Sequence, residues 1–330
     1  MTARHGLRSA IRAALIDGAV GDVDEHLARS LAVLPSLRAA ARCVSPGDVA
    51  RAQMAMVDLG RVHRRLADAG ILCVVLKGGA LLASGRVPLG ARHLDDLDIL
   101  VPAPHATRAL QILEADGFVV REGVLHDGTA HRDRHSHQLP MMMAPGGTMV
   151  ELHVETHVPD ETFEDVNGDA ESAALPTTMP MLAGVRVPAP WRLLRQLCAH
   201  VVLHHRAETR LWPRHLFDMQ AMKAVPFNDG VDVGGVVRFS RAVFAGFVDP
   251  RAPQWSRAMA RLLVAPDPRV ERAVVAVALL ARTGRMIRAG GLVAAAWPSA
   301  AHLRFTGDLP RGDDDVVRAR VRRWRRLLPR

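Results

Sequence analysis

The sequence predicts an α+β protein in which a small β-sheet is flanked by an N-terminal helical segment and a C-terminal helical domain. Two observations lead to this prediction. Apolar runs of strand length, rich in β-branched residues, lie in the middle of the chain, whereas both ends carry apolar residues at helical spacing. With 330 residues, 49% of them hydrophobic and 23% charged, the chain has the size and composition of a globular protein of about two domains.

The chain divides into four consecutive parts. These are an N-terminal helical segment, an α/β core, a linker rich in Asp, Glu, Pro, Thr and Met, and a C-terminal helical domain, at residues 1–66, 67–158, 159–189 and 190–330. In the first part we expect helices at 4–17, 22–42 and 45–69. Ser45 and Pro46 favour a helix start, because serine is a common N-cap and proline is tolerated at the first helical position.

The core is expected to combine short strands with helices. The strands are predicted near residues 71–76, 97–101, 118–121, 136–143 and 148–155, and the helices near 78–84 and 104–116. Gly117 follows the second helix and is typical of a helix C-terminus. Three of these strands carry, within them or directly next to them, the residues that point to a function.

Asp96 and Asp98 stand at the start of the predicted strand 97–101 and are the most informative pair in the chain. Side chains on a strand alternate between its faces, so both carboxylates point the same way. Two carboxylates a few ångströms apart repel each other beside an apolar core, and a divalent cation such as Mg²⁺ relieves that repulsion. Aspartates with this spacing also occur in surface turns and helix caps, so the pair alone does not decide the function.

Lys77, Gly78 and Gly79 follow the apolar run 71–76 directly and precede a predicted helix. A strand, a glycine turn and a helix N-terminus can bind phosphate, because backbone N–H groups point outward and glycine lets the phosphate approach. Lys77 adds a positive charge. The spacings of a P-loop and of a dinucleotide-binding fingerprint are absent, and an ordinary strand–turn–helix corner remains the alternative.

A third acid lies on a later strand. In residues 148–155 apolar and polar residues alternate, which places Glu151, His153 and Glu155 on one face. If this strand lies beside the strand of Asp96, Glu151 completes a three-carboxylate site for two metal ions. Such a site could activate a hydroxyl and stabilise charge on a phosphoryl oxygen. The alternative is that Glu151 lies on the solvent face of an edge strand.

Taken in this order, the motifs resemble those of the DNA polymerase β-like nucleotidyltransferase superfamily and, more closely, of the uncharacterised bacterial nucleotidyltransferase family. That family is similar in showing a leucine-lysine-glycine start, an arginine before a D-x-D strand, and a later acid–hydrophobic–histidine strand. The matching residues here are Leu76-Lys77-Gly78, Arg92, Asp96-Leu97-Asp98 and Glu151-Leu152-His153, followed in the helical part by His200, His204, Leu211-Trp212 and Leu216-Phe217-Asp218. The resemblance covers roughly residues 65–225.

The resemblance implies a small mixed β-sheet core and the transfer of a nucleoside monophosphate from an NTP, with ATP the expected one, to an acceptor hydroxyl. The implied catalytic residues and ligands of two Mg²⁺ ions are Asp96, Asp98 and Glu151, and the implied nucleotide-binding residues are Lys77, Gly78, Gly79, Arg92 and His153. The acceptor could be a small molecule, a peptide or protein, or a tRNA. A packing role remains open for His153, whether Arg92 reaches the triphosphate also stays open, and we expect Asp218 to cap or pair within a helical body rather than to perform chemistry.

Two alternatives from other functional classes remain open. Gly79 stands where the superfamily often has serine, and Glu151 where aspartate is commoner, so the chain could be a catalytically inactive nucleotide-binding or scaffold protein. The net charge is +9, and residues 318–330 contain seven arginines. This basic end is expected to form a helix docked on the body, but it could also make the chain an RNA-binding protein.

The sequence also favours a particular location. Cys43, Cys73 and Cys198 lie far apart and form no C-x-x-C or zinc pattern, which favours reduced thiols. The N-terminus lacks the apolar core of a signal peptide, and no run of ~18 uncharged residues looks membrane-spanning. We therefore expect a cytoplasmic enzyme without a membrane span.

Overall fold

The strands form where the sequence has its β-rich runs, although most are shorter than predicted. The computed structural model describes residues 3–18, 25–30, 32–40, 42–120, 139–156, 158, 161–169, 179–204, 211–226, 235–263, 315 and 317–318. Within these residues the strands are β1 (Val74–Val75), β2 (Asp96–Leu100), β3 (Val119–Val120), β4 (Met142–Met143) and β5 (Met149–His153). They form one five-stranded sheet in the order β1-β2-β5-β4-β3.

The sheet is mixed. Strands β2 and β5 run parallel, whereas the pairs β1–β2, β5–β4 and β4–β3 are antiparallel. Parallel neighbours need a long connection, and the chain between β2 and β5 includes the 3₁₀-helix η1 (Ala103–His105), helix α6 (Ala106–Ala115) and the strands β3 and β4. The predicted α+β fold with a small mixed sheet is therefore confirmed.

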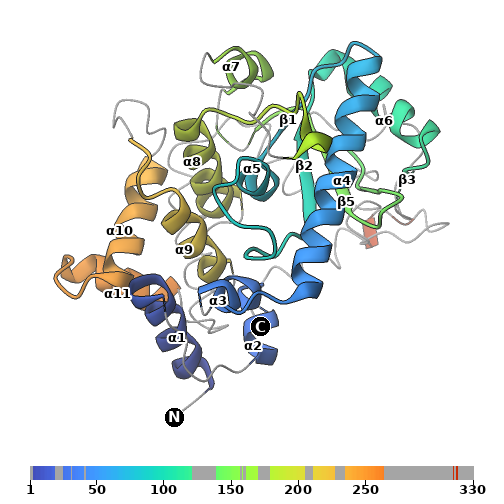
Figure 1. The fold of residues 1–330 in the computed structure, drawn as a ribbon. Coiled ribbons are helices and arrows are strands. Elements are labelled where there is room, and N and C mark those ends of the chain that lie inside the picture. The colour runs from blue at the N-terminus through green and yellow to red at the C-terminus, as the bar shows by residue number, and fades with distance from the viewer. Residues whose placement is uncertain are drawn as a thin grey trace.

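Helices surround the sheet on several sides (Figure 1). Their bounds are α1 (Ala3–Asp17), α2 (Glu25–Ser30), α3 (Leu34–Ala40), α4 (Pro46–Asp68), α5 (Lys77–Ala83), α7 (Phe163–Gly168), α8 (Pro190–Ala199), α9 (Trp212–Ala221), α10 (Val236–Val248) and α11 (Gln254–Leu263). A 3₁₀-helix, η2 (Pro180–Leu182), and a π-helical turn, η3 (His200–His204), complete the described elements. As predicted, α4 starts after Ser45 with Pro46 in its first turn.

The single helix predicted at residues 22–42 is wrong, because the chain turns between α2 and α3. Ala32 has a φ of 54°, in the left-handed region that interrupts an α-helix. The Val33 N–H donates to the carbonyl oxygen of Ala28 at 3.0 Å, as at many helix C-termini. The turn buries Val33 completely, and burial of this apolar side chain favours the break.

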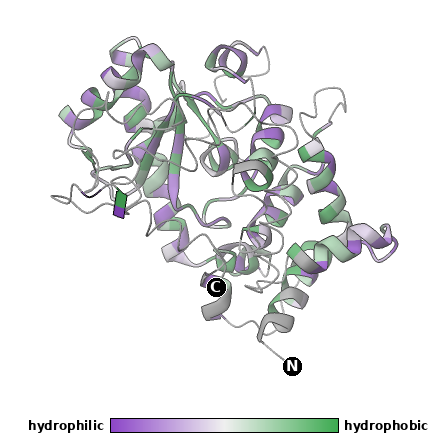
Figure 2. Ribbon diagram, turned by 180° about the vertical axis from the view of Figure 1, so that it is seen from behind, coloured by the Kyte–Doolittle hydropathy of each residue, from purple (hydrophilic) through white to green (hydrophobic). Residues whose placement is uncertain are grey.

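The main hydrophobic core lies on one face of the two central parallel strands. Leu97 and Ile99 of β2 and Val150 and Leu152 of β5 are fully buried in a cluster that includes residues of α4, α5, α6 and α8. Figure 2 shows hydrophobic residues (green) along the sheet, with hydrophilic residues (purple) between them. Because side chains alternate along a strand, the opposite face of the same two strands carries the acidic residues.

The predicted linker contains a short helix that packs on the sheet. Thr162 and Asp165 form a capping box at the start of α7, in which the Asp165 N–H donates to Thr162 Oγ1 at 3.2 Å and the Thr162 N–H donates to Asp165 Oδ2 at 2.9 Å. Phe163 and Val166 of this helix form a small buried cluster with β-strand residues that include Leu100. This part of the chain therefore contributes to the packing around β2.

A second hydrophobic cluster joins the first helix to helices near the other end of the described chain. Ile11 of α1, Trp212 of α9 and Val243 of α10 are among its buried members. Figure 1 shows α1 beside α10 and α11. The division of the chain at residues 66, 158 and 189 stays a prediction, and the helix expected at the arginine-rich end lies outside the described residues except for 317–318. No described helix combines the length and apolar character needed to cross a membrane.

Candidate active site

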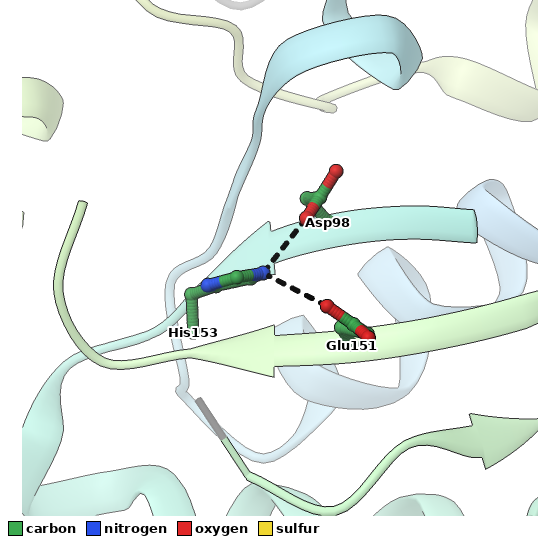
Figure 3. Close-up of side chains that lie close together, drawn as sticks. All are labelled: Asp98, Glu151 and His153. Carbon is green, nitrogen blue, oxygen red and sulfur yellow. Dashed lines mark hydrogen bonds and ion pairs between the residues drawn. The ribbon is translucent and has the colours of Figure 1, made fainter. Parts of the chain in front are cut away.

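The pairing of β2 with β5 brings two of the predicted acids together. In the parallel register Asp98 lies opposite Glu151, and Leu100 lies opposite His153. Figure 3 shows the side chains of Asp98, Glu151 and His153 pointing to the same side of the two strands. The prediction that the two acid-bearing strands are neighbours is thus confirmed, and Glu151 is not on an edge strand.

These three side chains form a compact buried cluster. The Nε2 atom of His153 lies 2.8 Å from Asp98 Oδ1 and 3.6 Å from Glu151 Oε2. One potential metal-ligating atom from each residue lies within 4.8 Å of the others. Asp98, Glu151 and His153 are 4%, 8% and 1% exposed, so their charges are poorly screened by water.

Lys77 also reaches this cluster, from the first position of α5. Its ammonium nitrogen donates to Asp98 Oδ1 at 2.5 Å, so the lysine and His153 share one carboxylate oxygen. The backbone φ of Lys77 is 47°, in a region that favours glycine, and such strain costs about 1–3 kcal/mol in a non-glycine residue. A lysine at a strained position is consistent with a requirement for its side chain at Asp98.

The protonation equilibria of the cluster follow from these contacts. Burial alone would raise the pKa of Asp98, but Lys77 and His153 hold it well below its usual range. The pKa of Asp96 is raised to about 7, first by burial and then by the negative charges of Asp98 and Glu151. Burial and Lys77 lower the pKa of His153, but its bonds to Asp98 and Glu151 outweigh them and raise it.

The cluster has the donor atoms of a divalent-cation site. Two carboxylates supply the oxygen ligands that Mg²⁺ prefers, and an imidazole nitrogen can join a divalent cation when it is unprotonated. Asp96 lies on the same strand, and its pKa responds to Asp98 and Glu151. Among the described residues, however, the cluster that could hold one ion consists of Asp98, Glu151 and His153, without Asp96. The sequence pattern had suggested that His153 binds the nucleotide. The geometry instead places His153 among the residues that could bind the metal ion.

The two predicted phosphate-binding glycines lie in the first turn of α5, where close packing explains both. A Cβ atom on Gly79 would lie 2.7 Å from Val75 Cγ2 and 3.2 Å from Leu97 Cδ2, closer than such atoms can approach without a shift. A Cβ atom on Gly78 would lie 1.9 Å from Nη1 of Arg92. The absence of a serine at residue 79 thus has a packing reason, because α5 sits directly on β1 and β2.

Arg92 forms a buried ion pair that the sequence did not reveal. Its Nε donates to Asp218 Oδ1 at 2.7 Å and its Nη2 donates to Asp218 Oδ2 at 3.0 Å. Asp218 lies on α9, 126 residues further along the chain, and no local pattern links the two positions. Asp218 does form an ion pair, as expected, but its partner precedes β2 and so lies outside the helical body in which the partner was expected.

The fold and the site together define a class of protein. Adjacent parallel strands in a small mixed sheet bring two carboxylates and a histidine together, with a lysine–glycine turn beside them, as expected for a nucleotidyltransferase. The comparison with protein families identifies the particular one. The model of the family described as "Uncharacterised nucleotidyltransferase" matches residues 7–238, more than two thirds of the chain, and the protein belongs to that family. No curated protein and no solved structure matches the chain.

Proposed function

We propose that this nucleotidyltransferase moves a nucleoside monophosphate from an NTP, with ATP as the proposed donor, to an acceptor hydroxyl with the help of Mg²⁺. The observation that carries this proposal is the parallel register of β2 and β5, which sets Asp98 opposite Glu151 in a buried cluster. Membership of the nucleotidyltransferase family supports the same reaction type. The acceptor is proposed to be a small molecule, a peptide or protein, or a tRNA.

In this reaction the acceptor oxygen forms a bond to the α-phosphorus, the acceptor proton is lost, and the bond to pyrophosphate breaks. Asp98 and Glu151, with Asp96, would hold one or two Mg²⁺ ions, which neutralise phosphate charge and favour ionisation of the acceptor hydroxyl. Lys77 and Arg92 would bind the triphosphate beside Gly78 and Gly79. His153 would hold a proton at Nε2 and orient Asp98 while no ion is bound, and would join the metal ligands through the same nitrogen once that proton is lost.

Label transfer tests the proposal directly. The protein is incubated with Mg²⁺, cell extract and each NTP labelled at the α-phosphate, and products are separated by size and charge. We expect transfer by the wild type and a loss of at least ~10²-fold in Asp98→Asn, since the charge stabilisation there is worth several kcal/mol. Glu155→Gln is a matched control, because this exposed acid lies two residues after His153 and outside the cluster.

The same experiment separates the alternatives. Nucleotide binding without transfer in any extract would favour a catalytically inactive nucleotide-binding or scaffold protein. Salt-sensitive retention of RNA, with neither nucleotide binding nor transfer, would favour an RNA-binding protein that uses the arginine-rich residues 318–330. Transfer that is equal in the wild type and in Asp98→Asn would overturn the proposed site.

A further inference from the structure

Helix α9 holds the segment that leads into β2 at two points. Asp218 binds Arg92 through both carboxylate oxygens, and both side chains are buried. One turn earlier on the same helix, Arg214 Nη1 donates to Asp95 Oδ2 at 2.7 Å. The residues held, Arg92 and Asp95, lie four and one positions before Asp96. Helix α9 thus fixes the chain just before the strand that carries Asp96 and Asp98.

Among the described residues, the partners of Arg92 engage only some of the N–H donors of its guanidinium group. An arginine has five N–H groups in a planar fork. Within the described residues, Nε and Nη2 donate to Asp218 and Nη1 donates to the His93 carbonyl oxygen at 3.1 Å. Three N–H groups are thereby engaged, and two remain, one on each terminal nitrogen.

The position of Nη1 connects Arg92 to the proposed phosphate site. It lies directly over Gly78, where it would be 1.9 Å from a Cβ atom, so only glycine admits the guanidinium here. Gly78 follows Lys77, whose ammonium is on Asp98. Arg92 therefore lies beside the turn that carries Lys77. Burial lowers the pKa of Arg92, but the negative charges of Asp218 and then of Asp96 outweigh burial and raise it, so Arg92 also lies near Asp96.

We propose that Asp218 is a positioning residue for nucleotide binding: it holds Arg92 over Gly78 so that the remaining guanidinium N–H groups meet a phosphate oxygen of the nucleotide. This inference rests on the proposed function. The chemistry suits the role, because a two-pronged carboxylate pair fixes the plane of a guanidinium, which then binds phosphate with less loss of rotational freedom. A helix outside the sheet thereby contributes to the triphosphate site.

Asp218→Asn tests this role, since it keeps the shape of the side chain and removes its charge. Kd for MgATP is measured by calorimetry, and KM and kcat by label transfer. We expect Kd and KM to rise ~10- to 100-fold, the range for a lost charge-assisted hydrogen bond, with a smaller change in kcat. Arg92→Lys should weaken MgATP binding as well, because a lysine ammonium cannot make the two-pronged contact with Asp218. Asp116→Asn is the control, because Asp116 is likewise an aspartate in an arginine ion pair, here with Arg61 and Arg65 of α4, and is not part of the proposed site.

A double variant separates positioning from stability. In Arg92→Met with Asp218→Leu no buried charge is left unpaired, and such replacements are often neutral or stabilising. We expect a melting temperature close to that of the wild type and MgATP binding as weak as in Asp218→Asn. Wild-type affinity in the double variant, or an unchanged Kd and KM in Asp218→Asn, would overturn the inference and leave the pair a packing feature. If the wild type itself binds no NTP, the proposed function fails and takes this inference with it.

Discussion

The ammonium nitrogen of Lys77 lies 2.5 Å from Asp98 Oδ1, the same oxygen that His153 Nε2 approaches to 2.8 Å. Two donors therefore converge on one buried carboxylate oxygen. A divalent cation bound by Asp98 would need part of that space and would repel the ammonium group. Lys77 and a metal ion are thus expected to compete for Asp98, and a phosphate arriving with the metal would offer Lys77 a new partner.

The first prediction follows from this competition. Replacing Lys77 by methionine removes the charge but keeps a long side chain, so affinity for Mn²⁺ without nucleotide should rise by ~10-fold, while affinity for ATP should fall. Calorimetry with Mn²⁺ and with ATP measures both. Lys77→Gly is the matched variant, because it also removes the charge and suits the φ of 47°. Weaker Mn²⁺ binding in both variants would show that Lys77 does not oppose the metal.

The second prediction concerns Asp96 and Asp98, whose surroundings differ although they lie on one strand face. Asp98→Asn leaves Lys77 without its charged partner, so the melting temperature of the metal-free protein should fall. Asp96→Asn removes a carboxylate that repels Asp98 and Glu151 once it is ionised, so at pH 8 the melting temperature should rise by at least ~2 °C. Scanning calorimetry in EDTA measures both changes. Shifts of the same sign in the two variants would contradict the assigned charge balance.

The third prediction is that the stabilisation of the protein by Asp96→Asn depends on pH. The folded pKa of Asp96 is about 7, above the value of about 3.9 expected for an unfolded aspartate. Between these values the folded state binds more protons than the unfolded state, so the contribution of Asp96 to stability is lost as pH rises towards 7. The melting temperature of Asp96→Asn minus that of the wild type should therefore grow from pH 4.5 to about 7 and level off above it. A difference that is constant with pH would mean that Asp96 titrates normally.

Sequence reasoning was most successful where a local pattern decides the structure. Alternation in the residues of β5 put Glu151 and His153 on one face, and the structure brings both against Asp98. The same reasoning missed the capping box of α7, although Thr162 and Asp165 have the required spacing. Composition alone, rich in polar residues and proline, had suggested a loop.

Two features of the site could not be predicted from local patterns. The left-handed backbone of Lys77 precedes two glycines, either of which would have been the natural choice for such a conformation. The pairing of Arg92 with Asp218 depends on how α9 packs against the segment before β2, which is a property of the tertiary fold. Both features involve a buried charged side chain, Lys77 or Arg92, whose partner is distant in the sequence and is brought close only by the tertiary fold.

The last prediction concerns Gly79, which takes the place of a serine expected from the resemblance to the nucleotidyltransferase superfamily. If packing explains the glycine, Gly79→Ala and Gly79→Ser should both lower the stability of the protein, by about 1–3 kcal/mol, because either Cβ atom collides with Val75. Each substitution at Gly79 should cost less in a Val75→Ala background than in the wild type, since Val75 Cγ2 is the nearest atom, although Val75→Ala is itself destabilising. Urea unfolding measures these differences, and ATP affinity measured in parallel isolates the hydroxyl group. Normal stability in Gly79→Ser, combined with tighter ATP binding than in Gly79→Ala, would instead mean that residue 79 faces the phosphates and that its glycine weakens the site.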